Sequence, residues 1–126
     1  MNRERILVVD DDRLIRESLV ELLEDYGCTA VGASNGRDAM DALADDGACL
    51  ILLDLMMPVM DGRSFREAQI KRAELANIPV VLISAFENLQ NNAKTMQVEG
   101  YLQKPLNVSD VLELVKKYCA CSGGDA

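Results

Sequence analysis

Five polar side chains that could share one reaction come directly after short apolar runs. Asp10 and Asp11 follow ILVV, Asp54 follows LILL, Ser84 follows VVLI, and Lys104 follows YLQ. A short apolar run bounded by turn residues is typical of a strand that is covered on both faces. Because the carboxyl ends of parallel strands lie along one edge of a sheet, we expect these side chains to converge there.

Three carboxylates within a few ångström of one another repel, each pair by about 1 kcal/mol at 4 Å in water and by more when partly buried. Such a cluster implies a counter-ion, and an incomplete set of oxygen ligands suits Mg²⁺. A metal ion, a lysine and a hydroxyl beside a carboxylate are the groups that phosphoryl transfer requires. Asp54 is the candidate nucleophile, because its strand has neighbours on both sides.

The apolar periodicity indicates five strands that alternate with five helices. We expect strands at residues 5–10, 28–32, 50–53, 80–84 and 101–103, and helices at about 13–26, 36–45, 63–75, 87–97 and 108–119. This alternation predicts an α/β fold, with parallel strands joined by right-handed crossovers and helices on both faces of the sheet. The apolar first strand suits a central position, which gives the strand order 2-1-3-4-5.

Cap residues and composition refine the expected helices. The candidate caps are Asp11 or Asp12, Ser34 or Asn35, Asp61, and Asn107 or Ser109. Asp12 is expected to be a cap or solvated, not a metal ligand. The helix at 87–97 has little support from local propensity, because it is rich in Asn and Gln. The basic residues are expected on solvated helix faces.

Length and charge limit the classes of protein to be considered. The 126 residues suit one domain, with a core at about 5–119 and a short tail at 120–126. No apolar run approaches the roughly 20 residues of a membrane span, and the N-terminus does not resemble a signal peptide, so we expect a cytoplasmic protein. A net charge of −8 argues against direct binding to nucleic acid.

The four cysteines are interpreted as structural. Cys28 and Cys49 lie in apolar, strand-like runs, where cysteine usually acts as a small buried hydrophobe. Cys119 and Cys121 form a single CxC in a chain without histidine, which offers too few ligands for a structural zinc site. A cytosolic domain of this size does not need disulfides, and none is expected.

The segments ILVVDDD, LLDLMMPVMDG, VVLISA and YLQKP resemble, in order and spacing, the four signature blocks of response regulator receiver domains, which have a flavodoxin-like, doubly wound fold. The resemblance covers about residues 5–118. It implies that Asp54 is the phospho-acceptor and that Mg²⁺ is held by Asp10, Asp11, Asp54 and the main-chain carbonyl of Met56. It also implies that Ser84 and Tyr101 are switch residues, that Lys104 binds the phosphoryl group, and that the Lys104–Pro105 bond is cis.

Two functions of different classes fit these residues. The first is a stand-alone response regulator that accepts a phosphoryl group from a histidine kinase or phosphotransfer protein. Its target protein would bind the surface of about 87–97, 100–103 and 108–119, as in many receivers. The alternative is a Mg²⁺-dependent phosphohydrolase with an aspartyl nucleophile. Such enzymes carry a general acid two residues after the nucleophile, where this chain has Met56.

Overall fold

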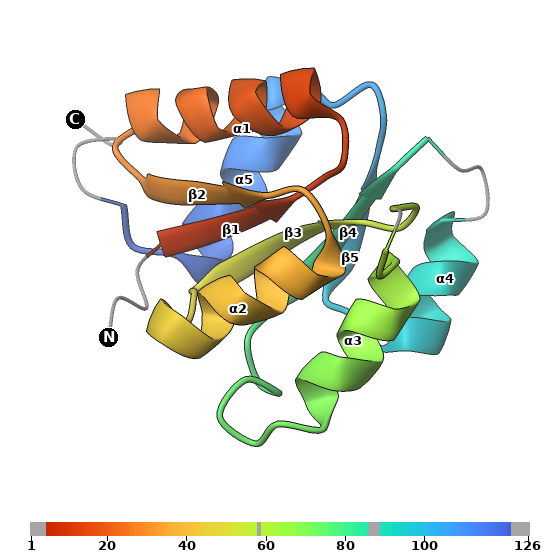
Figure 1. Ribbon diagram of the computed structural model, residues 1–126. Helices are drawn as coiled ribbons and strands as arrows, with labels where there is room; N and C mark the ends of the chain where they lie inside the picture. Colours follow the sequence, from red (N-terminus) through yellow and green to blue (C-terminus); the bar gives the residue numbers. More distant parts are fainter. Residues whose placement is uncertain (1–4, 58, 86–88, 122–126) are drawn as a thin grey trace.

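A five-stranded parallel sheet forms the middle of the protein, seen in a computed structural model that describes residues 5–57, 59–85 and 89–121 (Figure 1). The strands are β1 (Arg5–Val9), β2 (Thr29–Ala33), β3 (Leu50–Asp54), β4 (Val80–Ser84) and β5 (Gly100–Gln103). Their order is β2-β1-β3-β4-β5, and every pairing is parallel. The predicted fold class and strand order are therefore confirmed, and each predicted strand agrees with the structure to within one residue at either end.

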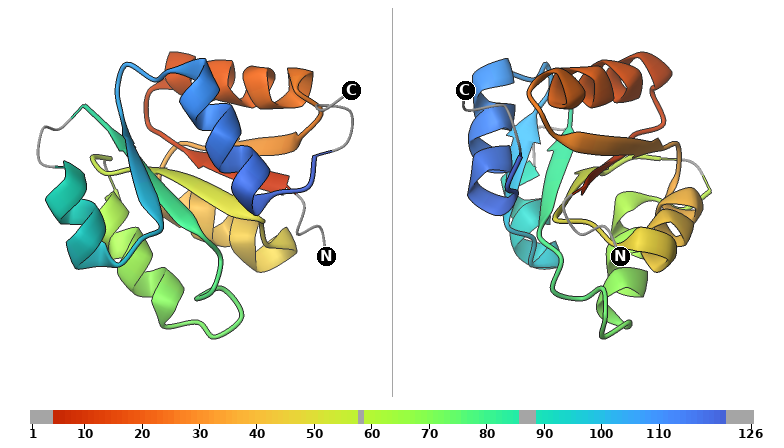
Figure 2. Two further views of the ribbon diagram at one scale, coloured as in Figure 1. Left: turned by 180° about the vertical axis from the view of Figure 1, so that it is seen from behind. Right: turned by 90° about the vertical axis from the view of Figure 1, so that its left-hand side faces the viewer.

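Helices cover both faces of the sheet (Figures 1 and 2). They are α1 (Arg13–Asp25), α2 (Gly36–Asp46), α3 (Gly62–Ile70), α4 (Leu89–Met96) and α5 (Val108–Tyr118). Helices α1 and α5 lie on one face, and α2, α3 and α4 lie on the other. Within the described ranges, no helix combines the length and apolar character that crossing a membrane requires.

Each central strand supplies side chains to two separate apolar cores. In β1, Ile6 and Val8 pack under α1 and α5, whereas Leu7 and Val9 pack under the other three helices. All four side chains are fully buried. This alternation follows from the two-residue period of a strand. Packing on both faces holds the strands in place and thereby fixes the positions of their carboxyl ends.

Four of the helices begin at a predicted cap. The side chains of Asp12, Asn35, Asp61 and Asn107 each accept a hydrogen bond from a backbone N–H group in the first turn of α1, α2, α3 and α5, respectively. Such caps satisfy donors that a helix cannot pair internally. For Asp12 the interpretation as a cap is confirmed.

Helix α3 is shorter than predicted, because a buried side-chain amide bonds to the backbone of the turns that follow it. The expected helix at 63–75 was wrong beyond Ile70. The fully buried side chain of Gln69 donates hydrogen bonds to the carbonyl oxygens of Leu75 (2.9 Å) and Ile78 (3.1 Å). These bonds satisfy the polar backbone of the turns before β4 without a continuing helix.

Helix α4 is held by two arginines of α3. Arg66 is only 8% exposed, which contradicts the expectation that the basic residues lie on solvated faces. It donates hydrogen bonds to the carbonyl oxygens of Met96 (3.1 Å) and Gln97 (2.7 Å) at the end of α4. Arg63 also donates to the side chain of Asn92. These contacts satisfy helix-end carbonyls and place a positive charge at the negative end of the helix dipole.

The cysteines form two disulfides, so the expectation of none was wrong. Cys28 pairs with Cys121 and Cys49 pairs with Cys119, with Cα–Cα distances of 4.7 and 5.6 Å. Cys28 and Cys49 come directly before β2 and β3, and α5 ends at this same edge of the sheet (Figure 2). The crossover of α5 therefore brings the CxC to two cysteines that are distant in sequence, a proximity that no local pattern reveals.

Reduction of these bridges should lower the stability of the protein. The bridges join residues 93 and 70 positions apart, and such cross-links typically contribute about 2–4 kcal/mol each, largely through the unfolded chain. We expect thermal unfolding to shift to lower temperature in a thiol-free reductant. Cys49→Ser/Cys119→Ser should show a part of that shift. A variant with all four cysteines replaced by serine is the control and should not respond to the reductant. Four titratable thiols in the unreduced, unfolded protein would contradict the pairing.

Candidate functional site

Three carboxylates meet at the carboxyl edge of the sheet, as predicted. Asp10 follows β1, Asp11 comes next in the chain, and Asp54 ends β3. One carboxylate oxygen from each lies within 4.8 Å of the others. Asp10 is fully buried and Asp54 is 4% exposed, whereas Asp11 faces solvent. The cluster is thus buried on the sheet side and accessible past Asp11.

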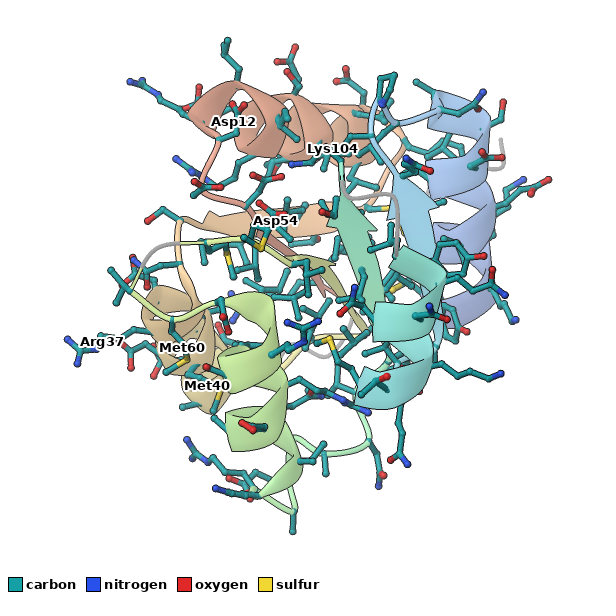
Figure 3. The ribbon with its side chains drawn as sticks, turned by 90° about the vertical axis from the view of Figure 1, so that its right-hand side faces the viewer. Asp12, Arg37, Met40, Asp54, Met60 and Lys104 are labelled. Carbon is teal, nitrogen blue, oxygen red and sulfur yellow. A yellow bond between two sulfur atoms is a disulfide. The ribbon has the colours of Figure 1, made fainter. Side chains whose placement is uncertain are left out.

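Lys104, which follows β5, supplies a positive charge to this cluster (Figure 3). Its Nζ atom lies 2.9 Å from Asp10 Oδ2 and 3.8 Å from Asp54 Oδ2. Burial alone would lower the pKa of the Lys104 ammonium, but the contact with Asp10 and the charges of Asp54 and Asp11 outweigh it and raise that pKa. Lys104 is therefore a firmly charged group between two buried carboxylates.

Backbone contacts fix the orientation of both buried carboxylates. Asp10 Oδ1 accepts a hydrogen bond from the N–H of Asp12 (2.9 Å), and Asp54 Oδ1 accepts one from the N–H of Met56 (3.3 Å). Gly62, the first residue of α3, packs so closely that an added Cβ would lie 2.8 Å from the carbonyl oxygen of Asp54. A glycine is therefore needed there for the loop after β3 to fold back against the end of the strand.

The surroundings of Asp54 raise the pKa of its carboxyl group from an ordinary value near 3.8 to about 7. Burial is the largest cause, and the neighbouring charge of Asp10 adds to it. The charge of Lys104 and the hydrogen bond from Met56 act in the opposite direction but do not cancel the effect. One lysine does not neutralise three carboxylates, and the site favours a further positive charge.

The donor set fits a hard divalent cation. Asp10 Oδ2 is fully buried and lies 2.9 Å from the Lys104 ammonium, which Asp54 Oδ2 shares at 3.8 Å. Three carboxylates that share one lysine at the same edge of the sheet are the type of ligand set that Mg²⁺ binds. Asp10, Asp11 and Asp54 could hold such an ion together.

The other residues implied by the resemblance lie around this cluster. Ser84 is buried at the end of β4, one position beyond Ile83, which pairs with Asp54. Tyr101 lies on the edge strand β5 and is 43% exposed. The Lys104–Pro105 peptide bond is cis, as the resemblance implies. The roles of Ser84, Tyr101 and the Met56 carbonyl are not fixed by this geometry and stay predictions.

One residue near the site was missed. Arg16 was placed with the polar face of α1, but in the structure it is half-buried and donates a hydrogen bond to the carbonyl oxygen of Asp10 (2.9 Å). Its position four residues after the cap Asp12 was the available signal, because a side chain in the first turn lies close to the residues before the helix.

Known proteins are similar to this chain over most of its length, with about a third of the aligned residues identical. A family model described as the response regulator receiver domain matches residues 6–116. Protein PilG of Pseudomonas aeruginosa is 30% identical over 116 residues, which cover 90% of this chain and 86% of that protein. Sporulation initiation phosphotransferase F of Bacillus subtilis is 32% identical over 122 residues, 94% of this chain and 95% of that protein. The chain spans 47% of the length of response regulator MprA of Mycolicibacterium vanbaalenii, with 34% identity over 110 residues.

Solved structures agree with the architecture described above. The chemotaxis protein CheY4 of Vibrio cholerae, crystallised at low pH, matches with a TM-score of 0.83 at 25% identity. The match covers 92% of this chain and 98% of that one. The flavodoxin-like fold of CheY-like proteins, predicted from the sequence motifs, is thereby confirmed.

The raised pKa of Asp54 predicts that Asp54→Asn stabilises the metal-free protein in a pH-dependent way. The folded state binds the Asp54 proton more tightly than the unfolded chain, so wild-type stability falls as pH rises from about 4 to 7. Asparagine does not ionise, so the variant should unfold at higher temperature above pH 7, and a gain of about 1 kcal/mol corresponds to about 4 °C. The difference should shrink toward pH 4. Asp41→Asn, at an exposed position of α2, is the control. Equal unfolding temperatures of wild type and Asp54→Asn at pH 8 would contradict the prediction.

Proposed function

The chain belongs to the response regulator receiver domain family, and from that premise we propose that it acts as the phospho-acceptor of a response regulator and is phosphorylated on Asp54. The phosphoryl group would come from a histidine kinase or a phosphotransfer protein, and phosphorylation would change binding to a downstream target. The observation that carries this proposal is the buried Asp54 carboxylate, 3.8 Å from Lys104 and clustered with Asp10 and Asp11. The name of the Bacillus subtilis relative, a phosphotransferase, supports phosphoryl transfer.

In the proposed reaction, an oxygen of Asp54 attacks the phosphorus of a phosphohistidine on the donor protein. The new P–O bond forms as the P–N bond breaks, and the leaving imidazole takes the bonding pair and then a proton from solvent. Asp10, Asp11, Asp54 and the carbonyl of Met56 would hold Mg²⁺, which when bound supplies positive charge beside the phosphoryl oxygens. Lys104 would neutralise a second phosphoryl oxygen.

Ser84 is the proposed hydroxyl donor to the transferred group. It ends β4, next to the strand that carries Asp54, and its position is fixed by the hydrogen bond from the N–H of Lys104 to its carbonyl oxygen (2.9 Å). The alternative of a phosphohydrolase has no supporting observation, since Met56 occupies the position of the required general acid and cannot transfer protons.

The phosphorylation site has a direct test. With phosphoramidate and Mg²⁺, the intact mass of the protein should increase by one phosphoryl group, and excess EDTA should prevent the increase. Asp54→Asn should abolish labelling, and Lys104→Met should slow it at least about tenfold, because it removes a preorganised charge. Asp41→Asn serves as the matched control and should be labelled like wild type. Undiminished labelling of Asp54→Asn would overturn the assignment.

We propose that the output surface comprises residues 87–97, 100–103 and 108–119. Of this range, residues 87 and 88 lie outside the described residues. Tyr101 and Val108 are exposed on the rest of this surface, by 43% and 53%. In the proposed switch, Ser84 moves toward the phosphoryl group and Tyr101 turns inward, which biases an equilibrium between two conformations. Helix α4 is the element best able to follow, because local propensity barely supports it.

Amide hydrogen exchange can locate this surface. Beryllofluoride mimics the phosphoryl group, and its addition with Mg²⁺ should change protection mainly in α4, β5 and α5. Asp54→Asn, treated in the same way, should show no change. If the protection of α1 alone responded in the wild type, the output surface would be wrongly placed.

A further inference from the structure

We propose that Arg16 is a positioning residue of the carboxylate cluster, which fixes the peptide between Asp10 and Asp11 so that both side chains are in place for a divalent cation. The functional consequence rests on the function proposed above. The positioning itself is a property of the metal-free protein and can be tested separately.

The backbone of Asp10 is held on both sides. Its N–H donates to the carbonyl oxygen of Ala33 in β2 (3.1 Å), which continues the sheet by one hydrogen bond. Its carbonyl oxygen accepts the hydrogen bond from Arg16 Nη1 (2.9 Å). The second contact fixes the peptide plane that leads into Asp11, at the point where the sheet no longer constrains the chain. Without it, the turn between β1 and α1 would lose a charged donor to its first carbonyl group.

Arg16 reaches this carbonyl because its stem lies across a glycine. The N–H of Arg16 bonds to the carbonyl oxygen of Asp12 (2.9 Å), which sets the residue in the first turn of α1. From there its side chain runs over Gly32 of β2, where an added Cβ would lie 2.9 Å from Arg16 Cγ and 3.0 Å from Cδ. Gly32 therefore provides the space for the arginine stem, and a methyl group there would displace it without removing its charge.

Arg13, on the same helix, differs from Arg16 in its exposure and in its partners. Its side chain is 79% exposed and pairs with Glu17 at 3.0 Å on the surface. Such exposed pairs contribute little to stability. Arg16 is half-buried and bonds instead to the backbone of the carboxylate cluster. Arg13 is therefore a matched control, with the same residue type on the same helix but no contact with the site.

The first experiment measures Mg²⁺ affinity in Arg16→Met, which keeps an apolar stem but loses the donor. Titrations followed by the backbone amide signals of residues 10–12 and 54 give the Kd. We expect binding about tenfold weaker than in wild type, the lower end of what loss of a residue that supports metal ligands typically causes. Arg13→Met should bind like wild type. Equal Kd values for Arg16→Met and wild type would overturn the proposal.

Gly32→Ala supplies a second test that leaves Arg16 in the sequence. It should weaken Mg²⁺ binding in the same direction while the strand still forms, because alanine suits a strand at least as well as glycine. In an Arg16→Ala background the same change should have no effect on the Kd, because no stem remains to be displaced. If Gly32→Ala weakened binding equally in both backgrounds, it would act independently of Arg16 and the proposal would fail.

A readout without metal separates this inference from the proposed function. The N–H of Asp12 bonds to Asp10 Oδ1 at 2.9 Å, so its hydrogen exchange reports on the orientation of Asp10. In the metal-free protein, Arg16→Met should speed exchange at the amides of Asp11 and Asp12, and Arg13→Met should not. Unchanged exchange in Arg16→Met would overturn the positioning role. A wild-type protein that binds no Mg²⁺ and accepts no phosphoryl group would overturn the proposed function instead.

Discussion

The structure depends on like charges that are forced together at one edge of the sheet. Asp10, Asp11 and Asp54 present oxygens within 4.8 Å of one another, and two of the three side chains are buried. Burial raises the pKa of Asp54 to about 7, the charge of Asp10 adds to this effect, and the charge of Lys104 does not cancel the two. The negative charge that Lys104 does not compensate destabilises the folded protein when no cation is bound. The same uncompensated negative charge favours the binding of a cation at the site. The carboxylates therefore lower the stability of the cation-free fold and favour binding.

The three carboxylates stay close together only if the strands that carry them are held in place against their mutual repulsion. The residues of β1, β3 and β4 that face the two apolar cores are almost completely buried, which fixes the strands from both sides. At the opposite edge, two disulfides join the end of α5 to the residues that precede β2 and β3. The sheet is therefore cross-linked where the strands begin and carries its unbalanced charge where they end.

Sequence patterns predicted the features that follow from local periodicity and from the common edge of parallel strands. Strand ends, the caps Asp12 and Asp61, and the convergence of Asp10, Asp54 and Lys104 follow from local periodicity and from the rule that parallel strands share one edge. The missed features join residues that neither of these two rules brings together. Cys28 and Cys121 are separated by 93 positions, and Arg66 bonds to a carbonyl 30 residues away. The sequence around a cysteine or an arginine does not show whether its side chain contacts solvent or a distant segment. Local patterns therefore predict a buried cysteine or an exposed arginine, but not these long-range contacts.

Helix α4 shows how such distant contacts change the behaviour of an element. Its composition favours a helix poorly, yet it forms because Leu89, Ala93 and Met96 pack on the core and Arg66 holds the carbonyl groups at its end. The polar contacts of Arg66 are concentrated at the carboxyl end, near Met96. A rotation of α4 about that end keeps these hydrogen bonds, whereas displacement of the whole helix would leave buried N–H groups of Arg66 without acceptors, which is unfavourable. Among the described residues, Arg66 therefore binds α4 at its carboxyl end, next to Met96.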